Sequence, residues 1–497
     1  MSTRTVLVTG ATGYVGGRLV PELLDRGDRV RVLVRNAERV RDLPWHARVD
    51  VRVGDAADPE ALRHALDGVD VAYYLLHSIQ EGPDLERTEA SVARGFASAA
   101  RECGVSRLVY LGGLAPQIPS RQMSPHMRSR VEVGEILRSS GVPTAELRAA
   151  VVIGSGSASF EMLRYLTERL PAMITPRWVR QRTQPIAIRD VLRYLVAAAD
   201  LPAEVNRAFD IGGPEVLTYE EMMHRYARVA GLRRRVILPI NLLTPGLSSH
   251  WVNVVTPVPR AIARPLVESL RHPSVCREHD IAQWIPDPPE GLLPFDEAVR
   301  LALTRIRDAQ VATRWSGALP PGVPSEPLPS DPQWTGGSLY EDVREVRTDA
   351  APEQVWAAVE RIGGEHGYYS ADFLWEVRGL VDRLLGGVGL RRGRRDPNML
   401  AIGEAVDFWR VEERIPPRLL RLRAEMRNPG LAWLEFAITP DGTGSLLRQR
   451  AVFLPRGLAG HAYWWSVAPF HAFVFPVMAR GITEQAEDRT DPPAGIA

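Results

Sequence analysis

The residues with the clearest chemistry are three glycines near the N-terminus, at positions 10, 13 and 16. They follow a short apolar run (residues 6–9) and precede a segment with helical spacing of leucines (residues 14–26). Glycines allow a tight turn and bring backbone N–H groups close to a pyrophosphate at the positive end of the following helix. The stretch Gly10-Ala11-Thr12-Gly13-Tyr14-Val15-Gly16 is therefore predicted to bind a dinucleotide, and a plain glycine-rich turn is the alternative.

Two charged residues follow the next predicted strands. Arg35 ends the strand of residues 30–34, at a point where NAD-preferring sites carry Asp or Glu. A guanidinium suits a 2′-phosphate, so NADP(H) is the preferred cofactor and NAD(H) the alternative. Asp55 follows the strand of residues 49–53 and could accept a hydrogen bond from the adenine amino group. A solvated surface arginine and a turn aspartate are the alternative interpretations.

Composition excludes several kinds of chemistry. The chain has no lysine, so all 61 basic residues are arginine. Schiff-base chemistry and a lysine-bearing phosphate loop are therefore excluded. Two cysteines, Cys103 and Cys276, give no disulfide framework and suit a reducing compartment. A net charge of +1 gives no field toward nucleic acid, and we predict no metal site. No signal peptide is recognised, so the expected location is cytoplasmic, with membrane association left open.

The first 155 residues alternate short apolar strands with amphipathic helices. This alternation is typical of an α/β fold with a doubly wound parallel sheet. The predicted strands are 6–9, 30–34, 49–53, 69–76, 107–111 and 145–153, and the predicted helices are 14–26, 59–66, 86–103 and 130–140.

The rest of the chain predicts an insertion, a linker and a second domain. The insertion starts at about residue 154, forms the substrate side of the first domain (residues 1–315), and has helices at 160–168, 188–199, 219–230 and 296–309. Residues 316–338 form a linker, because six prolines at this density suit neither a helix nor a central strand. Residues 339–490 have strand-like segments at 343–348, 401–411, 419–426, 431–439 and 446–454, a helix at 352–362 and a long apolar segment at 457–479. They predict an α+β domain whose curved sheet grips one helix.

The sequence resembles the atypical branch of the short-chain dehydrogenase/reductase superfamily, of the NmrA-like kind. The resemblance rests on the glycine stretch, on Gly54-Asp55 and on residues 72–78, and residues 124–130, 146–150 and 175–178 narrow it to a bacterial subgroup. In this subgroup the Rossmann domain is fused to a C-terminal domain of unknown function. The resemblance implies NAD(P) contacts at Gly10, Thr12, Gly13, Tyr14, Val15, Arg35, Asp55, Leu75, His77 and Gly112.

The superfamily's catalytic residues are absent at the expected positions. The family pairs a tyrosine with a lysine four residues later, and here His126 and Arg130 have that spacing. The usual upstream serine corresponds to Gly112 or Gly113. A histidine can donate a proton near neutral pH, so His126 and Arg130 are the candidate catalytic residues. The alternative is that they only line the cofactor cleft or cap a helix.

The C-terminal domain resembles the helix-grip fold of polyketide cyclases and lipid-transfer proteins. The resemblance rests on residues 349–356, the antiparallel meander and the final long segment, and it implies a hydrophobic cavity. Candidate lining residues, or else ordinary core residues, are Trp356, Trp375, Phe408, Trp409, Trp433, Phe436, Trp464 and Trp465. The basic patch at residues 391–395 could meet a phosphate or lipid headgroup, or be a solvated loop. Residues 457–479 favour a buried or membrane-touching helix over a membrane span.

These observations predict an NAD(P)H-dependent oxidoreductase acting on a hydrophobic small molecule. Two rivals stay open: a non-catalytic regulatory or scaffold protein that senses NADP(H), and a lipid- or isoprenoid-binding protein. The altered catalytic positions favour the rivals, whereas the retained cofactor motif and the added ligand fold favour the enzyme. Peripheral membrane contact is left open, a nucleic-acid partner is not expected, and the sequence names no protein partner.

Overall fold

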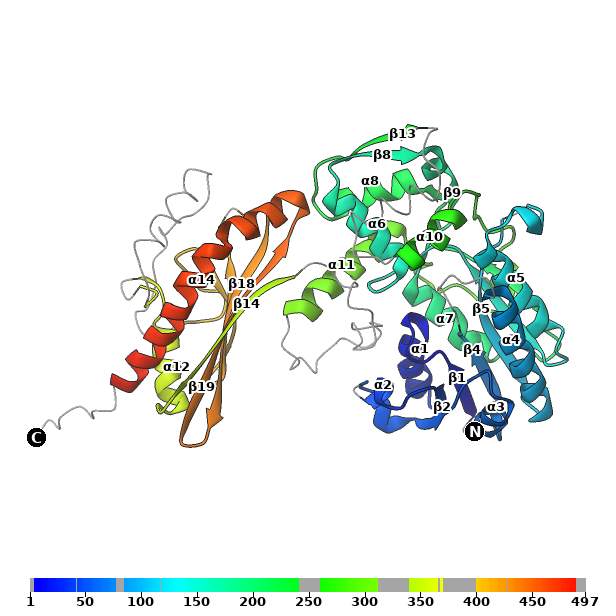
Figure 1. Cartoon of the computed structure of the whole chain (residues 1–497), viewed down its shortest axis with the longest axis horizontal. Coiled ribbons are helices and arrows are strands. Elements are labelled where there is room, and N and C mark those ends of the chain that lie inside the picture. Colours follow the sequence, from blue (N-terminus) through cyan, green and yellow to red (C-terminus); the bar gives the residue numbers. More distant parts are fainter. Residues whose placement is uncertain are drawn as a thin grey trace, which may run out of the picture. The chain divides into compact units, whose positions relative to one another are not determined.

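The structure is a computed structural model, which describes residues 4–41, 43–76, 85–116, 118–240, 260–311, 339–364, 367–369, 399–426 and 428–488. The chain divides into two compact units, Met1–Gly336 and Gly337–Ala497. Both are shown in Figure 1. The predicted linker (residues 316–338) and the basic patch (residues 391–395) lie outside the described residues.

The first unit contains a seven-stranded sheet in the order β11-β6-β5-β4-β1-β2-β3. Every neighbouring pair of strands is parallel. The bounds are β1 Thr5–Thr9, β2 Arg29–Val34, β3 Asp50–Val53, β4 Val71–Tyr74, β5 Arg107–Gly113, β6 Thr144–Ala149 and β11 Arg207–Ile211. The chain moves outward from β1 in both directions, so the predicted doubly wound parallel sheet is confirmed.

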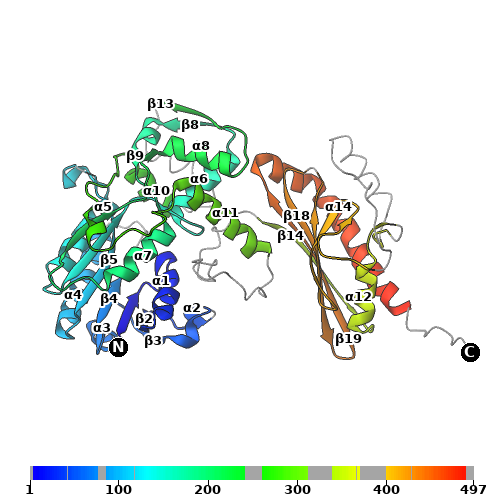
Figure 2. The same ribbon diagram turned by 180° about the vertical axis from the view of Figure 1, so that it is seen from behind.

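Helices cover both faces of this sheet (Figure 2). One face packs against α1 (Tyr14–Asp25) and α7 (Ile188–Ala198), with Val8 and Leu19 in the shared core. The other packs against α3 (Pro59–Leu66), α4 (Leu85–Glu102) and α5 (Pro125–Arg138), with Leu7 and Phe96 in that core. Both faces of the central strands are therefore buried, which explains their continuous apolar runs.

The insertion after β6 forms a separate layer with its own core, which includes Phe160 and Tyr226. The predicted helices are confirmed to within a few residues as α6 (Ala158–Arg169), α7, α8 (Tyr219–Val229) and α11 (Phe295–Val311). Elements that were not predicted include β11, α2 (Glu38–Arg41), α10 (Arg260–Ser269) and five of the six strands in three short pairs, since β7 falls within the predicted strand of residues 145–153. These pairs are β7 (Val152–Ile153) with β10 (Ile186–Ala187), β9 (Arg182–Thr183) with β12 (Leu217–Thr218), and β8 (Ala172–Pro176) with β13 (Val236–Ile240).

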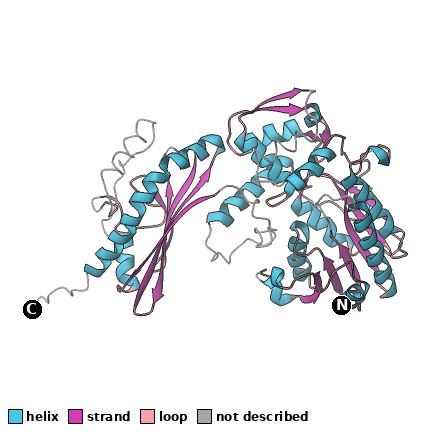
Figure 3. Ribbon diagram, in the orientation of Figure 1, coloured by secondary structure: helices cyan, strands magenta, loops and turns pink. Residues whose placement is uncertain are grey.

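The second unit is an antiparallel sheet in the order β14-β19-β18-β17-β16-β15, shown in magenta in Figure 3. The strands are β14 Tyr340–Thr348, β15 Ala405–Val406, β16 Trp409–Ile415, β17 Leu419–Ala424, β18 Gly430–Asp441 and β19 Gly444–Pro455. The predicted hairpin turn joins β18 to β19, and Gly442 adopts a positive φ of 62° there. The helices α12 (Pro352–Glu360) and α14 (Gly457–Glu487) share one core with the sheet, to which Val355, Phe436 and Met478 contribute.

The aromatic residues predicted to line a cavity have different environments. Six of them are buried, namely Trp356, Phe408, Trp409, Trp433, Phe436 and Trp464. Trp375 lies outside the described residues. Trp465 is 67% exposed, so its assignment to a cavity wall is wrong. Successive residues of a helix point about 100° apart. Because Trp464 faces the core, this rotation places Trp465 on the exposed side of the helix.

The long helix α14 contains the whole apolar segment of residues 457–479 and continues to Glu487. Among the described helices, none is long and apolar enough to cross a membrane.

Candidate functional site

The predicted dinucleotide turn has the backbone geometry that requires glycine. Gly10 adopts a positive φ of 72°, and its carbonyl accepts a hydrogen bond from the Gly13 amide at 2.9 Å. A Cβ on Gly16 would lie only 2.3 Å from the Gly10 oxygen, and a Cβ on Gly10 only 2.5 Å from the Leu75 oxygen. Helix α1 begins directly after Gly13. The turn thus forms a close-packed cradle at a helix N-terminus, which fits a pyrophosphate.

Arg35 and Asp55 lie at neighbouring strand ends. Arg35 directly follows β2 and is exposed, and Gly54-Asp55 follows β3, which pairs with β2 in parallel. One carboxylate oxygen of Asp55 accepts a hydrogen bond from the Ala57 amide at 2.9 Å, so this residue also stabilises a turn. Both side chains are accessible at the same edge of the sheet, as their sequence positions suggested.

The other residues implied as cofactor contacts differ in how close they lie to the glycine turn. Leu75 follows β4, and its carbonyl packs against the glycine turn. Gly112 is buried within β5, where a Cβ would lie 3.1 Å from a carboxylate oxygen of Glu146. It is Gly113, not Gly112, that lines the cavity described below. His77 lies outside the described residues.

Helix α1 is tied to the insertion by a buried arginine. One nitrogen of Arg18 donates to the Tyr14 carbonyl at 2.9 Å, and another donates to the Ser155 carbonyl at 3.2 Å. The guanidinium carbon also lies 4.2 Å from the centre of the Tyr14 ring. The Tyr14–Arg18 pair therefore joins the helix that follows the glycine turn to the loop that precedes α6.

His126 and Arg130 lie on the first turns of α5. The Ser124 hydroxyl caps this helix by accepting from the Met127 amide at 3.2 Å, and Pro125 occupies the first position. The Arg130 guanidinium donates to the Leu111 carbonyl in β5 and lies 4.9 Å from the centre of the Tyr110 ring. The helix start is therefore fixed against the carboxyl end of β5.

The environment of His126 controls its protonation. Burial, with a smaller contribution from the Arg130 charge, lowers the pKa of His126 from 6.5 to about 4. The imidazole is thus neutral at pH 7, and it can donate a hydrogen bond without carrying a positive charge. This low pKa changes the role that we expect for His126, from a cationic acid to a neutral donor.

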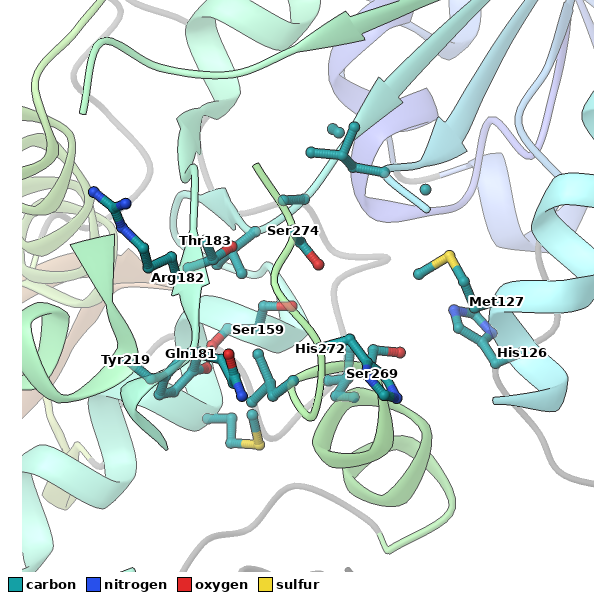
Figure 4. A pocket seen from close by; sticks show the side chains of 18 residues that line it. His126, Met127, Ser159, Gln181, Arg182, Thr183, Tyr219, Ser269, His272 and Ser274 are labelled. Atoms are coloured by element: carbon teal, nitrogen blue, oxygen red, sulfur yellow. Dashed lines mark hydrogen bonds between the residues drawn. The ribbon is translucent and has the colours of Figure 1, made fainter. Parts of the chain in front are cut away.

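A cavity of about 110 Å³ brings His126 together with residues of the insertion (Figure 4). Its wall includes Gly113 at the end of β5 and Ala149 at the end of β6. The polar lining residues are His126, Ser159, Gln181, Arg182, Thr183, Tyr219, Ser269, His272 and Ser274. Sequence reasoning predicted only His126 among them, because the others come from α6, β9, α8 and the end of α10, and no motif links them.

Tyr219 is the tyrosine among these lining residues, and it is held in place by the backbone. Its hydroxyl donates to the Ser159 carbonyl at 3.2 Å, and burial raises the pKa of Tyr219 above its usual value. Tyr219 therefore does not provide the activated tyrosine that the superfamily uses. Arg130, in turn, holds Tyr110 rather than activating it, since burial also raises the pKa of Tyr110.

Comparisons with known proteins find relatives of both units. Residues 10–152 match a family model described as NAD(P)H-binding, and residues 334–478 match a domain of unknown function, DUF2867. A phosphate ester reductase of Streptomyces griseus, (4-alkanoyl-5-oxo-2,5-dihydrofuran-3-yl)methyl phosphate reductase, is 33% identical over 46% of this chain and 74% of its own. A ceramide reductase of Caulobacter vibrioides is 29% identical over 49% of this chain and 74% of its own.

Solved structures are similar at lower sequence identity. The triphenylmethane reductase of Citrobacter sp., solved with NADP(H), has a TM-score of 0.46 and 22% identity over 60% of this chain and 99% of its own. A likeness at this level says nothing about the reaction. The fold, the glycine turn and the sequence relatives together define an NAD(P)H-binding Rossmann protein. The chain belongs to the atypical short-chain dehydrogenase/reductase family, with a DUF2867 domain as its second unit.

Proposed function

We propose that this protein is an NADPH-dependent reductase of an uncharged, hydrophobic carbonyl compound. The observation that best supports this proposal is the cavity that joins His126 to the carboxyl ends of β5 and β6. In doubly wound sheets, ligands bind at these ends. The names of the two relatives also denote reductases, although their substrates differ from one another.

The cofactor would be held by residues at the same edge of the sheet. Gly10, Gly13 and Gly16 would receive the pyrophosphate at the start of α1, and Arg35 would pair with the 2′-phosphate of NADP(H). Leu75 would lie beside them at the end of β4. When bound, the nicotinamide supplies a hydride.

His126 would act on the substrate oxygen. Its neutral imidazole can donate an N–H hydrogen bond to a carbonyl oxygen and so draw electron density from the carbonyl carbon. The carbonyl carbon would accept the hydride that NADPH supplies, and the oxygen would take its proton from water. Arg130 would act as a positioning residue, because its bond to the Leu111 carbonyl fixes the start of α5.

The test is whether the purified full-length protein oxidises NADPH when offered quinones, enals and aromatic ketones. We expect turnover with at least one class, followed as loss of nicotinamide absorbance, and none without an added substrate. NADPH binding with no turnover across the panel would contradict the proposal. That result would favour the rival, an NADP(H)-sensing regulatory protein, which the glycines at the usual serine position already support.

For the second unit, we propose a helix-grip domain whose outer helix face contacts a lipid surface. The supporting observation is the surface of α14 between the exposed residues Arg456 and Arg480, where the helix has no Asp, Glu or Arg. Trp465 and Phe473 are 67% and 61% exposed on this face. Exposed aromatic residues flanked by arginines suit the interface of an anionic membrane.

A further inference from the structure

A buried hydroxyl in the cavity lacks the hydrogen bond that such groups usually make. Thr183, in β9, is only 4% exposed and lines the cavity. Its Oγ1 atom has no hydrogen-bond partner in the part of the chain that the structure describes. Buried polar groups are nearly always hydrogen-bonded, so this hydroxyl is suited to a bond with a ligand.

The backbone that carries this hydroxyl is held on both sides. Thr183 pairs with Leu217 of β12 on one side and forms a bridge with Ser274 on the other. The Ser274 amide donates to the Arg182 carbonyl, and its carbonyl accepts from the Gln184 amide, both at 2.9 Å. The position of Thr183 is thus set by two flanking segments of the insertion.

The rest of the lining indicates what kind of ligand would fit. None of the cavity-lining residues is Asp or Glu, so nothing there balances a cationic ligand. Burial lowers the pKa of both His126 and His272, which favours the neutral form of each imidazole. The guanidinium of Arg182 points away from the other labelled side chains in Figure 4. The cavity therefore favours an uncharged ligand.

Side chains that can form hydrogen bonds lie on two sides of the cavity. Figure 4 shows His126 on one side of the cavity, and Thr183 on the other with Gln181 and Tyr219. We propose that the substrate is an uncharged carbonyl compound with a second oxygen acceptor, which the Thr183 hydroxyl binds while His126 binds the reacting carbonyl. Diketones and quinones are the simplest members of this class. The inference rests on the proposed function for the reacting end only.

Direct binding to the full-length protein loaded with NADP⁺ tests this proposal without turnover. The matched ligands are 1,4-cyclohexanedione and cyclohexanone, which differ by one carbonyl oxygen, with dissociation constants measured by ligand-detected NMR. We expect the native protein to bind the dione about three- to tenfold more tightly, as one net hydrogen bond would give. Thr183→Val should remove this preference, and Thr183→Ser should retain most of it.

Thr175 provides a matched control. It is also a buried threonine, 8% exposed, with an unpartnered Oγ1, but it does not line the cavity. Thr175→Val should leave both affinities unchanged. Neither valine should lower Tm, because neither removes a hydrogen bond made in the described part of the chain.

Three results would overturn the inference. These are equal affinities of the native protein for the two ligands, an unchanged preference in Thr183→Val, and a lower Tm for Thr183→Val than for Thr175→Val. Failure of both ligands to bind would likewise exclude this class. If the preference for the dione depends on Thr183 but the protein shows no turnover, only the proposed reduction is refuted, and the inference about the ligand stands.

Discussion

Arg35 is the residue on which cofactor choice should depend, because it is exposed at the end of β2 with no acid in its place. A charge-assisted bond to a 2′-phosphate contributes about 1.5–3 kcal/mol, so NADPH should bind at least about tenfold more tightly than NADH. Calorimetry of the native protein and Arg35→Ala should show this preference and its loss. Arg233→Ala, which removes an exposed arginine elsewhere, should retain it. Equal affinities in the native protein would contradict the assignment.

The proposed role of His126 predicts how turnover and its pH dependence change when this residue is replaced. On an identified substrate, His126→Phe should lower turnover at least about a hundredfold with little change in cofactor affinity, whereas His64→Phe should not. Because the pKa of His126 is lowered to about 4, kcat/KM should show no inflection from this imidazole near pH 6.5. A loss centred near pH 6.5 that disappears in His126→Phe would refute the neutral-donor role.

The same shift affects stability. The unfolded chain binds a proton at this imidazole with a pKa of 6.5, and the folded chain only at about 4. Between these values the unfolded state binds more protons, so the free energy of unfolding should decrease as the pH falls through this range. Denaturant titrations should show a smaller decrease in His126→Phe.

At the scale of elements, the turn between β1 and α1 should tolerate no side chain at Gly16. A Cβ there would lie 2.3 Å from backbone oxygen, so Gly16→Ala must displace the turn and should weaken NADPH binding at least about tenfold. Gly95→Ala is the control, since its Cβ would meet only a leucine methyl at 3.9 Å within α4. Similar cofactor affinity in native and Gly16→Ala protein would contradict the assigned turn.

The exposed face of helix α14 is predicted to bind anionic lipid vesicles. The double variant Trp465→Ser/Phe473→Ser removes mainly exposed apolar area, together with an edge contact between Trp465 and Tyr340, so Tm should change little. Cosedimentation with anionic vesicles should decrease, and added salt should weaken binding of the native protein because Arg456 and Arg480 contribute by charge. Native protein that stays in the supernatant with both anionic and neutral vesicles would exclude the contact.

At the scale of the whole molecule, the features that could be predicted from the sequence are those that depend on local sequence pattern. The parallel sheet, the glycine turn and the order of elements in the second unit all follow from periodicity and turn residues. The cavity wall did not, because Thr183, Tyr219 and His272 come together only through short strands and a helix with no distinctive motif. Trp465 was misassigned because an aromatic residue can suit either a core or an exposed face, and its helix phase decides which.

Cleavage between the two units tests whether they are independent. Each has its own hydrophobic core, and six prolines mark the predicted linker. Limited proteolysis should therefore cut first within the predicted linker (residues 316–338), and the N-terminal fragment should bind NADPH as tightly as the full chain. Mass spectrometry and calorimetry would identify the cut and the affinity. Initial cleavage within the Rossmann sheet, or a fragment that loses the cofactor, would contradict this organisation.

The buried Arg18 has a consequence for the affinities of the two ligands. It joins the helix that receives the cofactor to Ser155, just before the helix that supplies Ser159 to the cavity. Ordering one end of this connection lowers the entropic cost of ordering the other, so the two binding equilibria are linked. Linkage is reciprocal: the factor by which the dinucleotide tightens substrate binding equals the factor by which substrate tightens the dinucleotide. One buried guanidinium can thus add to the cooperativity of the two ligands, beyond what their direct contact contributes.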